Sequence, residues 1–104
     1  MILEEILTAL RNNHHLFTKH ALEKLTKSKI KIREVMRAVL HAEMIEDYPM
    51  AYPYPACLVL GFLNNGDPVH FVWAFNRQKG YAILVTAYRV APTLWSPDFR
   101  KRVK

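Results

Sequence analysis

Residues 56–75 read ACLVLGFLNNGDPVHFVWAF, two apolar runs separated by the pair Asn65-Gly66. Both runs are rich in branched and aromatic side chains, which fit the pleated surface of a β-sheet. Asn-Gly is the strongest short signal for a β-hairpin, because both residues tolerate the positive φ angles of a tight turn. This stretch therefore predicts two antiparallel strands, over 56–63 and 69–75.

The turn also predicts how the two strands pair. With two residues in the turn, Leu60 lies opposite Phe71, and His70 lies opposite Gly61 on the other face. A histidine that faces a residue without a side chain has open space beside it. That space suits a ligand as well as a packing neighbour.

Further from the hairpin, the hydrophobic period changes once, near residue 43. After that point, 44–48 and 81–88 are also strand-like. Before it, apolar residues recur at helical spacing. The three helical segments are 2–11, from Thr18 up to Ser28, and about 32–42. Helices followed by antiparallel strands indicate an α+β fold, with N-terminal helices packed on a four-stranded antiparallel sheet.

The starts of the second and third helices differ in quality. Thr18 is a good N-cap, and Phe17 before it is placed to pack on Leu22. Lys31 stands at the cap of the third helix, where a short polar residue is preferred. That helix start is therefore locally weak.

The size of the chain, 104 residues, is that of one domain, and we expect residues 1–104 to fold as a unit. The one cysteine, Cys57, lies in an apolar run, which favours a buried thiol and a cytoplasmic protein. No apolar run approaches the roughly 20 residues of a membrane helix, and the acidic start argues against a secretory signal. The five histidines lack the spacing of a zinc site, so we expect no metal and no other cofactor.

The charge of the chain is strongly basic. Fifteen Lys and Arg against nine Asp and Glu give a net charge of +6. A small basic domain binds nucleic acid, an acidic protein or an anionic membrane, and charge alone does not choose among them. The basic residues crowd 19–37 and the tail from Arg100 to Lys104.

A stripe of chemically useful side chains follows the second predicted helix. His20 lies in its first turn, and Lys24 and Lys27 follow at i+4 and i+7 on the same side. The imidazole suits a general base, and the lysines suit phosphate groups. The plainer interpretation is a solvated lysine face beside a partly exposed histidine, and the residue pattern alone favours it.

The strands carry a second set of such residues. His70 is flanked by apolar residues, where a hydrogen-bonded packing histidine is the commoner case. Tyr88 and Arg89 close the last strand, and element ends carry function more often than strand centres. Two histidines, a tyrosine and an arginine are what a metal-free ribonuclease needs to move protons and stabilise a phosphorane. We therefore expect His20, His70 and Tyr88 to converge on one pocket.

Six motifs stand in order over about residues 15–102. They are Phe17-Thr18-Lys19-His20-Ala21, Tyr48-Pro49, Leu58-Val59-Leu60-Gly61, Pro68-Val69-His70, Thr86-Ala87-Tyr88, and Trp95 followed by Phe99-Arg100-Lys101-Arg102. In this order they resemble a bacterial, especially cyanobacterial, family known as domain of unknown function 4258. The chain departs from the family pattern at Val90-Ala91, where a Pro-Asp pair is usual, and at Lys24, where arginine is common.

The resemblance implies a relation to the ribonuclease toxins of RelE and BrnT type, whose helices pack on a four-stranded antiparallel sheet. It implies cleavage of single-stranded RNA, mRNA in particular, and a cognate antitoxin protein as partner. The implied catalytic residues are His20, His70 and Tyr88, and the implied RNA phosphate ligands are Lys24, Lys27 and Arg89. Two alternatives stay open: a non-catalytic module of the same fold that binds RNA or protein, and a small-ligand-binding or accessory subunit that shares only the scaffold.

Overall fold

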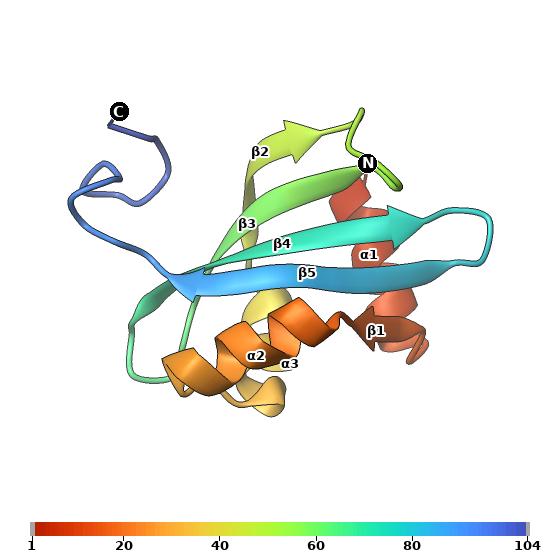
Figure 1. Cartoon of the computed structure of the whole chain (residues 1–104), viewed down its shortest axis with the longest axis horizontal. Helices are drawn as coiled ribbons and strands as arrows, with labels where there is room; N and C mark the ends of the chain where they lie inside the picture. The colour runs from red at the N-terminus through yellow and green to blue at the C-terminus, as the bar shows by residue number, and fades with distance from the viewer. Residues whose placement is uncertain (1, 104) are drawn as a thin grey trace.

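The computed structural model, which describes residues 2–103, places three helices against a five-stranded sheet (Figure 1). The elements in chain order are α1 (Ile2–Arg11), β1 (His15–Phe17), α2 (Lys19–Ser28), α3 (Ile32–Val39), β2 (Glu43–Tyr48), β3 (Ala56–Phe62), β4 (Pro68–Asn76) and β5 (Tyr81–Arg89). All three helices precede the four longer strands. The predicted α+β class is therefore confirmed.

The sheet differs from the prediction by one strand. β2, β3, β4 and β5 form the expected antiparallel set, and the order across the sheet is β1-β5-β4-β3-β2. β1 adds a fifth, parallel strand, because it pairs with Ala82–Leu84 of β5. The prediction of a four-stranded, wholly antiparallel sheet was therefore wrong. Three residues are too few to show a periodic pattern, so nothing in the local sequence indicated this strand.

The chain passes from β1 directly into α2, and Thr18 fixes that helix on the sheet. As the predicted N-cap, it accepts the Ala21 N–H at 3.0 Å, and its hydroxyl donates to the Val85 carbonyl oxygen at 3.1 Å. One side chain therefore caps the helix and ties it to β5. At the start of α3, the Glu34 carboxylate accepts the Lys31 N–H at 3.0 Å, which compensates for the weak cap.

The β3–β4 hairpin forms as predicted, but its register is shifted by one residue. The turn has three residues, 64–66, and Gly66 adopts a φ of 91°. The Leu63 N–H donates to the Asp67 carbonyl oxygen across this turn at 3.0 Å. The Asn65 side-chain oxygen accepts the Asp67 N–H at 3.0 Å, which stabilises the longer turn.

The shift exchanges the faces of the two strands relative to each other. His70 pairs with Leu60 and Gly61 pairs with Val69, so the predicted His70–Gly61 pair was wrong. Because side chains alternate along a strand, a slip of one residue moves each of them to the other face. Gly61 faces α3, where a Cβ would come within 3.3 Å of the Ala38 Cβ. Its missing side chain makes room for a helix and leaves no open space beside His70.

Two hydrophobic clusters cover the two faces of the sheet. The larger lies beneath the helices and includes the fully buried Trp73. The smaller lies on the opposite, outer face, where Trp95 packs with Leu58 and Leu60. Trp95 belongs to residues 90–103, which we call the C-terminal strap. The strap leaves the end of β5 and lies on the side of the sheet away from α2 (Figure 1).

The substitution Gly61→Val tests the observed register. The added side chain would enter the contact between β3 and α3, and overpacking a filled core costs about 1–3 kcal/mol. We expect urea unfolding to show a loss of stability of that size, and Ala38→Val, on the other side of the contact, to be destabilising as well. A Gly61→Val variant as stable as the wild type would place this residue on the outer face and contradict the three-residue turn.

Candidate functional site

His70 is the one polar residue of 2–103 that is buried, with 0 % of its surface exposed. Its Nδ1 lies 3.1 Å from the Tyr88 hydroxyl, and its Nε2 lies 2.9 Å from the Phe99 carbonyl oxygen. A carbonyl only accepts, so we assign the ring proton to Nε2, and Nδ1 accepts from the Tyr88 O–H. The Trp95 ring covers the imidazole, with 4.3 Å between the ring centroids.

These surroundings determine what His70 can do. Burial lowers its pKa, although the hydrogen bond to the Phe99 carbonyl partly opposes that shift. The imidazole is therefore neutral near pH 7. Both of its nitrogens are engaged and its ring does not meet solvent, so it has no lone pair to offer a substrate in this arrangement. His70 is placed to orient Tyr88, whose own pKa burial raises, and to hold the strap.

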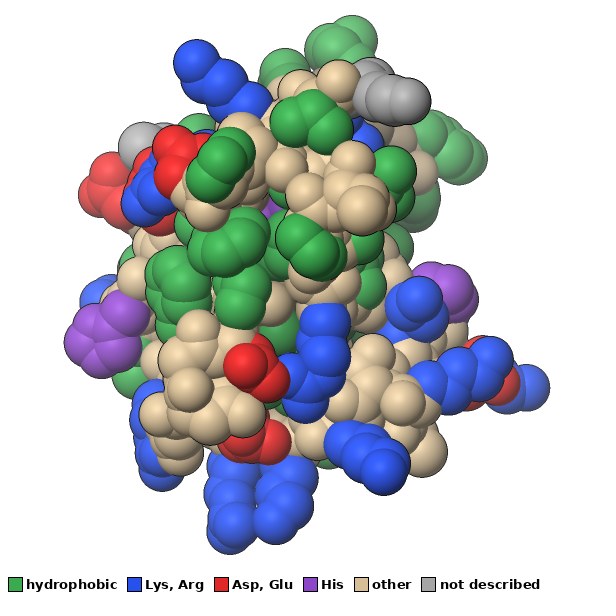
Figure 2. Space-filling view, turned by 90° about the vertical axis from the view of Figure 1, so that its left-hand side faces the viewer, with side chains coloured by type: hydrophobic (Ala, Val, Ile, Leu, Met, Phe, Trp, Pro, Cys, Tyr) green, Lys and Arg blue, Asp and Glu red, His purple; other side chains and the backbone are tan. Residues whose placement is uncertain are grey.

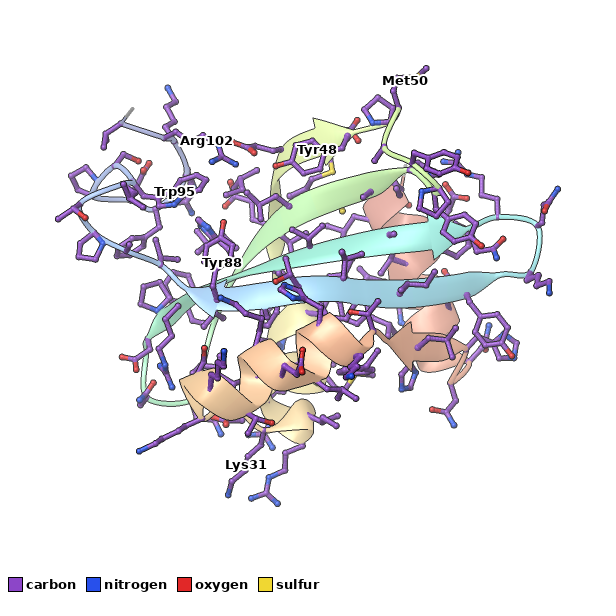
Figure 3. All side chains as sticks on the ribbon, viewed as in Figure 1. Lys31, Tyr48, Met50, Tyr88, Trp95 and Arg102 are labelled. Carbon is purple, nitrogen blue, oxygen red and sulfur yellow. The ribbon has the colours of Figure 1, made fainter. Side chains whose placement is uncertain are left out.

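The C-terminal strap carries ion pairs as well as aromatic rings. Arg100 donates to both carboxylate oxygens of Glu43 at 2.8–3.1 Å, and Arg102 donates to both oxygens of Glu46 at 3.0 Å. The Arg102 guanidinium also lies 4.8 Å from the centre of the Trp95 ring. Figure 3 shows Arg102 and Trp95 together on the strap, above the strands. Both glutamates belong to β2, so the ion pairs tie the strap to the edge of the sheet.

The ion pairs change the role of the basic tail. Hydrogen bonds from the arginines lower the pKa of both Glu43 and Glu46. Exposed pairs of this kind contribute roughly 0–1 kcal/mol, whereas removing a buried tryptophan costs about 3–5 kcal/mol. The ring of Trp95 therefore holds the strap, and the arginines direct it onto β2. Lys104, the last residue of the tail, lies outside the described residues.

His20 lies at the edge of β5 and does not join His70. Its ring is exposed, and its Nε2 lies 3.1 Å from the Thr86 hydroxyl. The pairing of β4 with β5 skips Val85, a β-bulge of the kind that re-aims side chains. Thr86 and Tyr88 are two residues apart on one strand, about 7 Å. The predicted single pocket is therefore two neighbouring hydrogen-bonded pairs, His20–Thr86 and His70–Tyr88.

Arg89 is the last residue of β5 and lies at the opposite end of α2 from His20. Its guanidinium donates to the Asp67 carboxylate at 2.7 Å and to the carbonyl oxygen of Ser28, the last residue of α2, at 3.1 Å. This predicted phosphate ligand thus already has an acidic partner. Together with the His20–Thr86 pair at the other end, it fixes α2 alongside β5.

Lys24 lies between these two anchors. A helix rises about 1.5 Å per residue and a strand about 3.4 Å. Lys24, four residues past His20, is therefore level with Tyr88, two residues past Thr86. Lys27 follows on an exposed position of the same helix. Within residues 2–103, neither lysine pairs with an acidic side chain.

Positive charge gathers on residues 19–37, which we call the basic face and which span α2 and α3. This segment has seven Lys or Arg and two Glu, a net charge of +5. Figure 2 shows Lys and Arg side chains projecting in the lower part of the molecule, the side on which α2 and α3 lie in Figure 1. Since the tail arginines pair with β2, the basic face is the main positive surface left for a partner.

Three residues that shape the site were not predicted for it. Glu46 gave no sequence signal, because its partner Arg102 is 56 residues away along the chain. Thr86 stood in a motif of the family resemblance, but nothing near it indicated His20, which is 66 residues away. Trp95 stood among the motifs of the family resemblance, and its position over His70 gives it a structural reason. Long-range pairing, unlike periodicity, leaves no pattern in the sequence near either partner.

Other sequence predictions concern single features of the chain. Cys57 is buried as predicted, and burial raises the pKa of its thiol to about 12. Within residues 2–103, no group of three or more His, Cys, Asp or Glu is placed to hold a metal ion. The helices of the same residues include none that is both long and apolar enough to cross a membrane.

Comparison with known proteins returns one family. Proteins described as Domain of unknown function (DUF4258) match residues 17–89, which confirms that part of the resemblance. The matched span holds the basic face and all six predicted site residues, and it ends where the strap begins. No curated protein and no solved structure matches the chain.

The buried imidazole predicts a pH dependence of stability. Because burial lowers the pKa of His70 only in the folded state, the unfolded chain binds its proton first as the pH falls. Stability should be full above the ordinary histidine pKa of about 6.5 and should decrease below it, by at most about 1.4 kcal/mol per pH unit. Urea unfolding between about pH 7.5 and pH 5.5 measures this, above the range where carboxylates titrate.

Two variants assign the decrease to its source. His70→Gln should remove it, whereas His41→Gln, at an exposed position, should keep it. A decrease of equal size in His70→Gln and in the wild type would show that His70 is not its cause.

Proposed function

Because the chain belongs to the DUF4258 family of domains of unknown function, we propose its function from the site itself: a toxin-like endoribonuclease of RelE and BrnT type that cleaves single-stranded RNA without a metal. One observation carries the proposal. The exposed His20 and the unpaired Lys24 lie along the same edge of β5 as Tyr88. A base, a cation and an oriented hydroxyl beside a basic face are the groups that this chemistry needs.

RNA would bind along the basic face. A single strand carries one negative charge per nucleotide, and each phosphate that meets a lysine releases a counterion, which drives association. Lys24 and Lys27 follow His20 along α2, the helix that lies beside β5, so phosphates held by them would lie near His20. Arg89 is engaged by Asp67, so it contributes to the field of this edge and holds α2 in place.

The hydrogen bonds of Tyr88 give it a positioning role. Its proton points to His70 Nδ1, so its oxygen has lone pairs left to accept from another donor. In the proposed reaction that oxygen accepts from the Lys24 ammonium and holds it against the phosphorane. His20 takes the proton of the ribose 2′-hydroxyl, the 2′-oxygen attacks phosphorus, and water protonates the leaving 5′-oxygen.

A second candidate function is a non-catalytic module that binds RNA or an acidic protein on the same face. The observation that favours it is the state of His70, which is fully buried with both ring nitrogens engaged. Catalysis would then rest on His20 without a second titrating histidine. For either function, an acidic segment of a cognate antitoxin is the protein partner that this charge fits. A cytoplasmic location stays a prediction from the sequence.

The proposed function predicts that Lys24 and Lys27 contribute to RNA binding. For a single strand, each phosphate contact adds about 0.7 to the steepness with which log affinity falls against log salt concentration. Lys24→Ala with Lys27→Ala removes two such contacts and should therefore reduce that steepness by about 1.4. Anisotropy of a short labelled RNA over a KCl series measures it. Arg11→Ala with Lys79→Ala removes two exposed charges elsewhere and should leave the slope unchanged. Equal salt slopes for both double variants would show that Lys24 and Lys27 do not contact the RNA.

The next prediction concerns cleavage. In EDTA, the wild type should cut single-stranded RNA, and His20→Ala should lower the rate by about 10²–10⁴ at unchanged RNA affinity. Replacing the ribose with deoxyribose should abolish cutting, because the nucleophile is the 2′-hydroxyl. If the wild type binds RNA but does not cut it under any of these conditions, the binding-module function replaces the ribonuclease.

A further inference from the structure

The outer face of the sheet contains a groove that the strap leaves open. Its volume is about 410 Å³, and it lies over the centre of the sheet beside the loop between β2 and β3. Its lining consists of Val72, Ala74, Ile83, Val85 and Ala56 from the strands, Tyr48, Ala51, Tyr52, Pro53 and Tyr54 from β2 and the loop, and Thr18. The groove is therefore apolar at its base and aromatic along one wall.

The sequence explains why this space stays open. Three prolines, at 49, 53 and 55, lack the N–H that a strand ladder needs, so this segment forms a loop beside the sheet and not a further strand. Ala56 and Ala74 are small and leave depth below the loop. The bulge at Val85 brings an additional apolar side chain to the groove. None of these features contributes to the hydrophobic core beneath the helices.

One end of the groove adjoins the proposed RNA path. Thr18 lines it and is bonded to the Val85 carbonyl, while the next residue of β5, Thr86, is bonded to His20. An apolar space and a basic edge thus meet within one residue of the strand. Nucleotides have the same division, a charged phosphate joined to an apolar-faced base.

We propose that this groove holds one unpaired base of the bound RNA strand, stacked against Tyr52, while the phosphate of that nucleotide lies at His20 and Lys24. The inference rests on the proposed function and assigns the groove as the subsite for one base of the RNA. Tyr52 is 96 % exposed, so its ring face is free to stack. Stacking on tyrosine tolerates every base, so the site would add affinity without strict sequence preference.

A base fits this groove better than an apolar peptide does, for a reason of position. A peptide would gain from the apolar lining alone, whereas a nucleotide gains from the lining and from the positive edge next to it. The basic face carries a net charge of +5 over residues 19–37, and Thr18, the residue directly before it, lines the groove. Charge and apolar surface together therefore fit a nucleic acid strand better than an apolar peptide.

The test compares two variants in the same loop. Tyr52→Ala removes the stacking ring, and Met50→Ala removes a side chain that is 91 % exposed and points away from the sheet (Figure 3). Both should fold, because neither position is buried. We expect Tyr52→Ala to weaken binding of a short single-stranded RNA by about 5- to 100-fold and Met50→Ala to have no effect. An abasic strand of equal charge should bind both variants like the wild type.

A second measurement makes the result independent of RNA affinity. Uridine or adenosine, which carry no charge, should shift the NMR signals of the Val72, Ile83 and Val85 methyl groups in the wild type. If RNA binds but Tyr52→Ala has no effect and these methyl signals do not move, the base subsite is wrong and the proposed function stands. If RNA does not bind but nucleosides move the signals, the groove is a nucleoside site only, and both the RNA subsite and the proposed function fail. A response to an apolar tripeptide and not to nucleosides would overturn the base assignment.

Discussion

The three-residue turn between β3 and β4 is the constraint on which the rest of the structure depends, because it decides which face of the sheet each side chain of these two strands occupies. With this register, Gly61 meets Ala38 of α3 on one face, and His70 meets Trp95 on the other. A slip of one residue in β4 would turn His70 into the helix layer and Phe71 out to the strap. The hydrogen bond from the Asp67 N–H to the Asn65 side chain is a small interaction, but it stabilises the turn that goes with this register.

The strap shows how a strongly basic chain uses part of its charge internally. Arg100 and Arg102 meet two glutamates of β2, so the tail adds little positive surface, and the ring of Trp95 supplies most of the binding. Because the same ring covers His70, the strap also decides that this histidine is buried and neutral. A residue that the sequence offers as a catalyst thus becomes the support of another side chain. The positive charge that remains for a partner lies on α2 and α3, away from the strap.

Strand β5 joins the features that the proposed function uses. Its bulge at Val85 allows consecutive residues to serve different purposes, one lining the apolar groove and the next holding His20. Two residues later, Tyr88 is held by His70 from beneath the strap. β1 covers only the first part of this edge, at Ala82–Leu84, and α2 runs beside the remainder. The groove and the His20–Thr86 pair therefore adjoin along β5, and α2 carries the lysines beside the rest of that strand.

The sequence by itself determined the α+β class, the Thr18 cap, the existence of the hairpin and the stripe of His20 with its two lysines. These features depend on residues close together in the chain, and local propensity and periodicity report them directly. It did not determine the length of the turn, because Asn65-Gly66 suits a turn of two residues as well as one of three, nor the three-residue strand β1. Only the tertiary structure decided that the two histidines separate, one beneath Trp95 and one exposed beside Thr86. The physical reason is that burial depends on what packs over a residue, and for His70 that is a segment about 25–30 residues further along the chain, with Phe99 at a separation of 29.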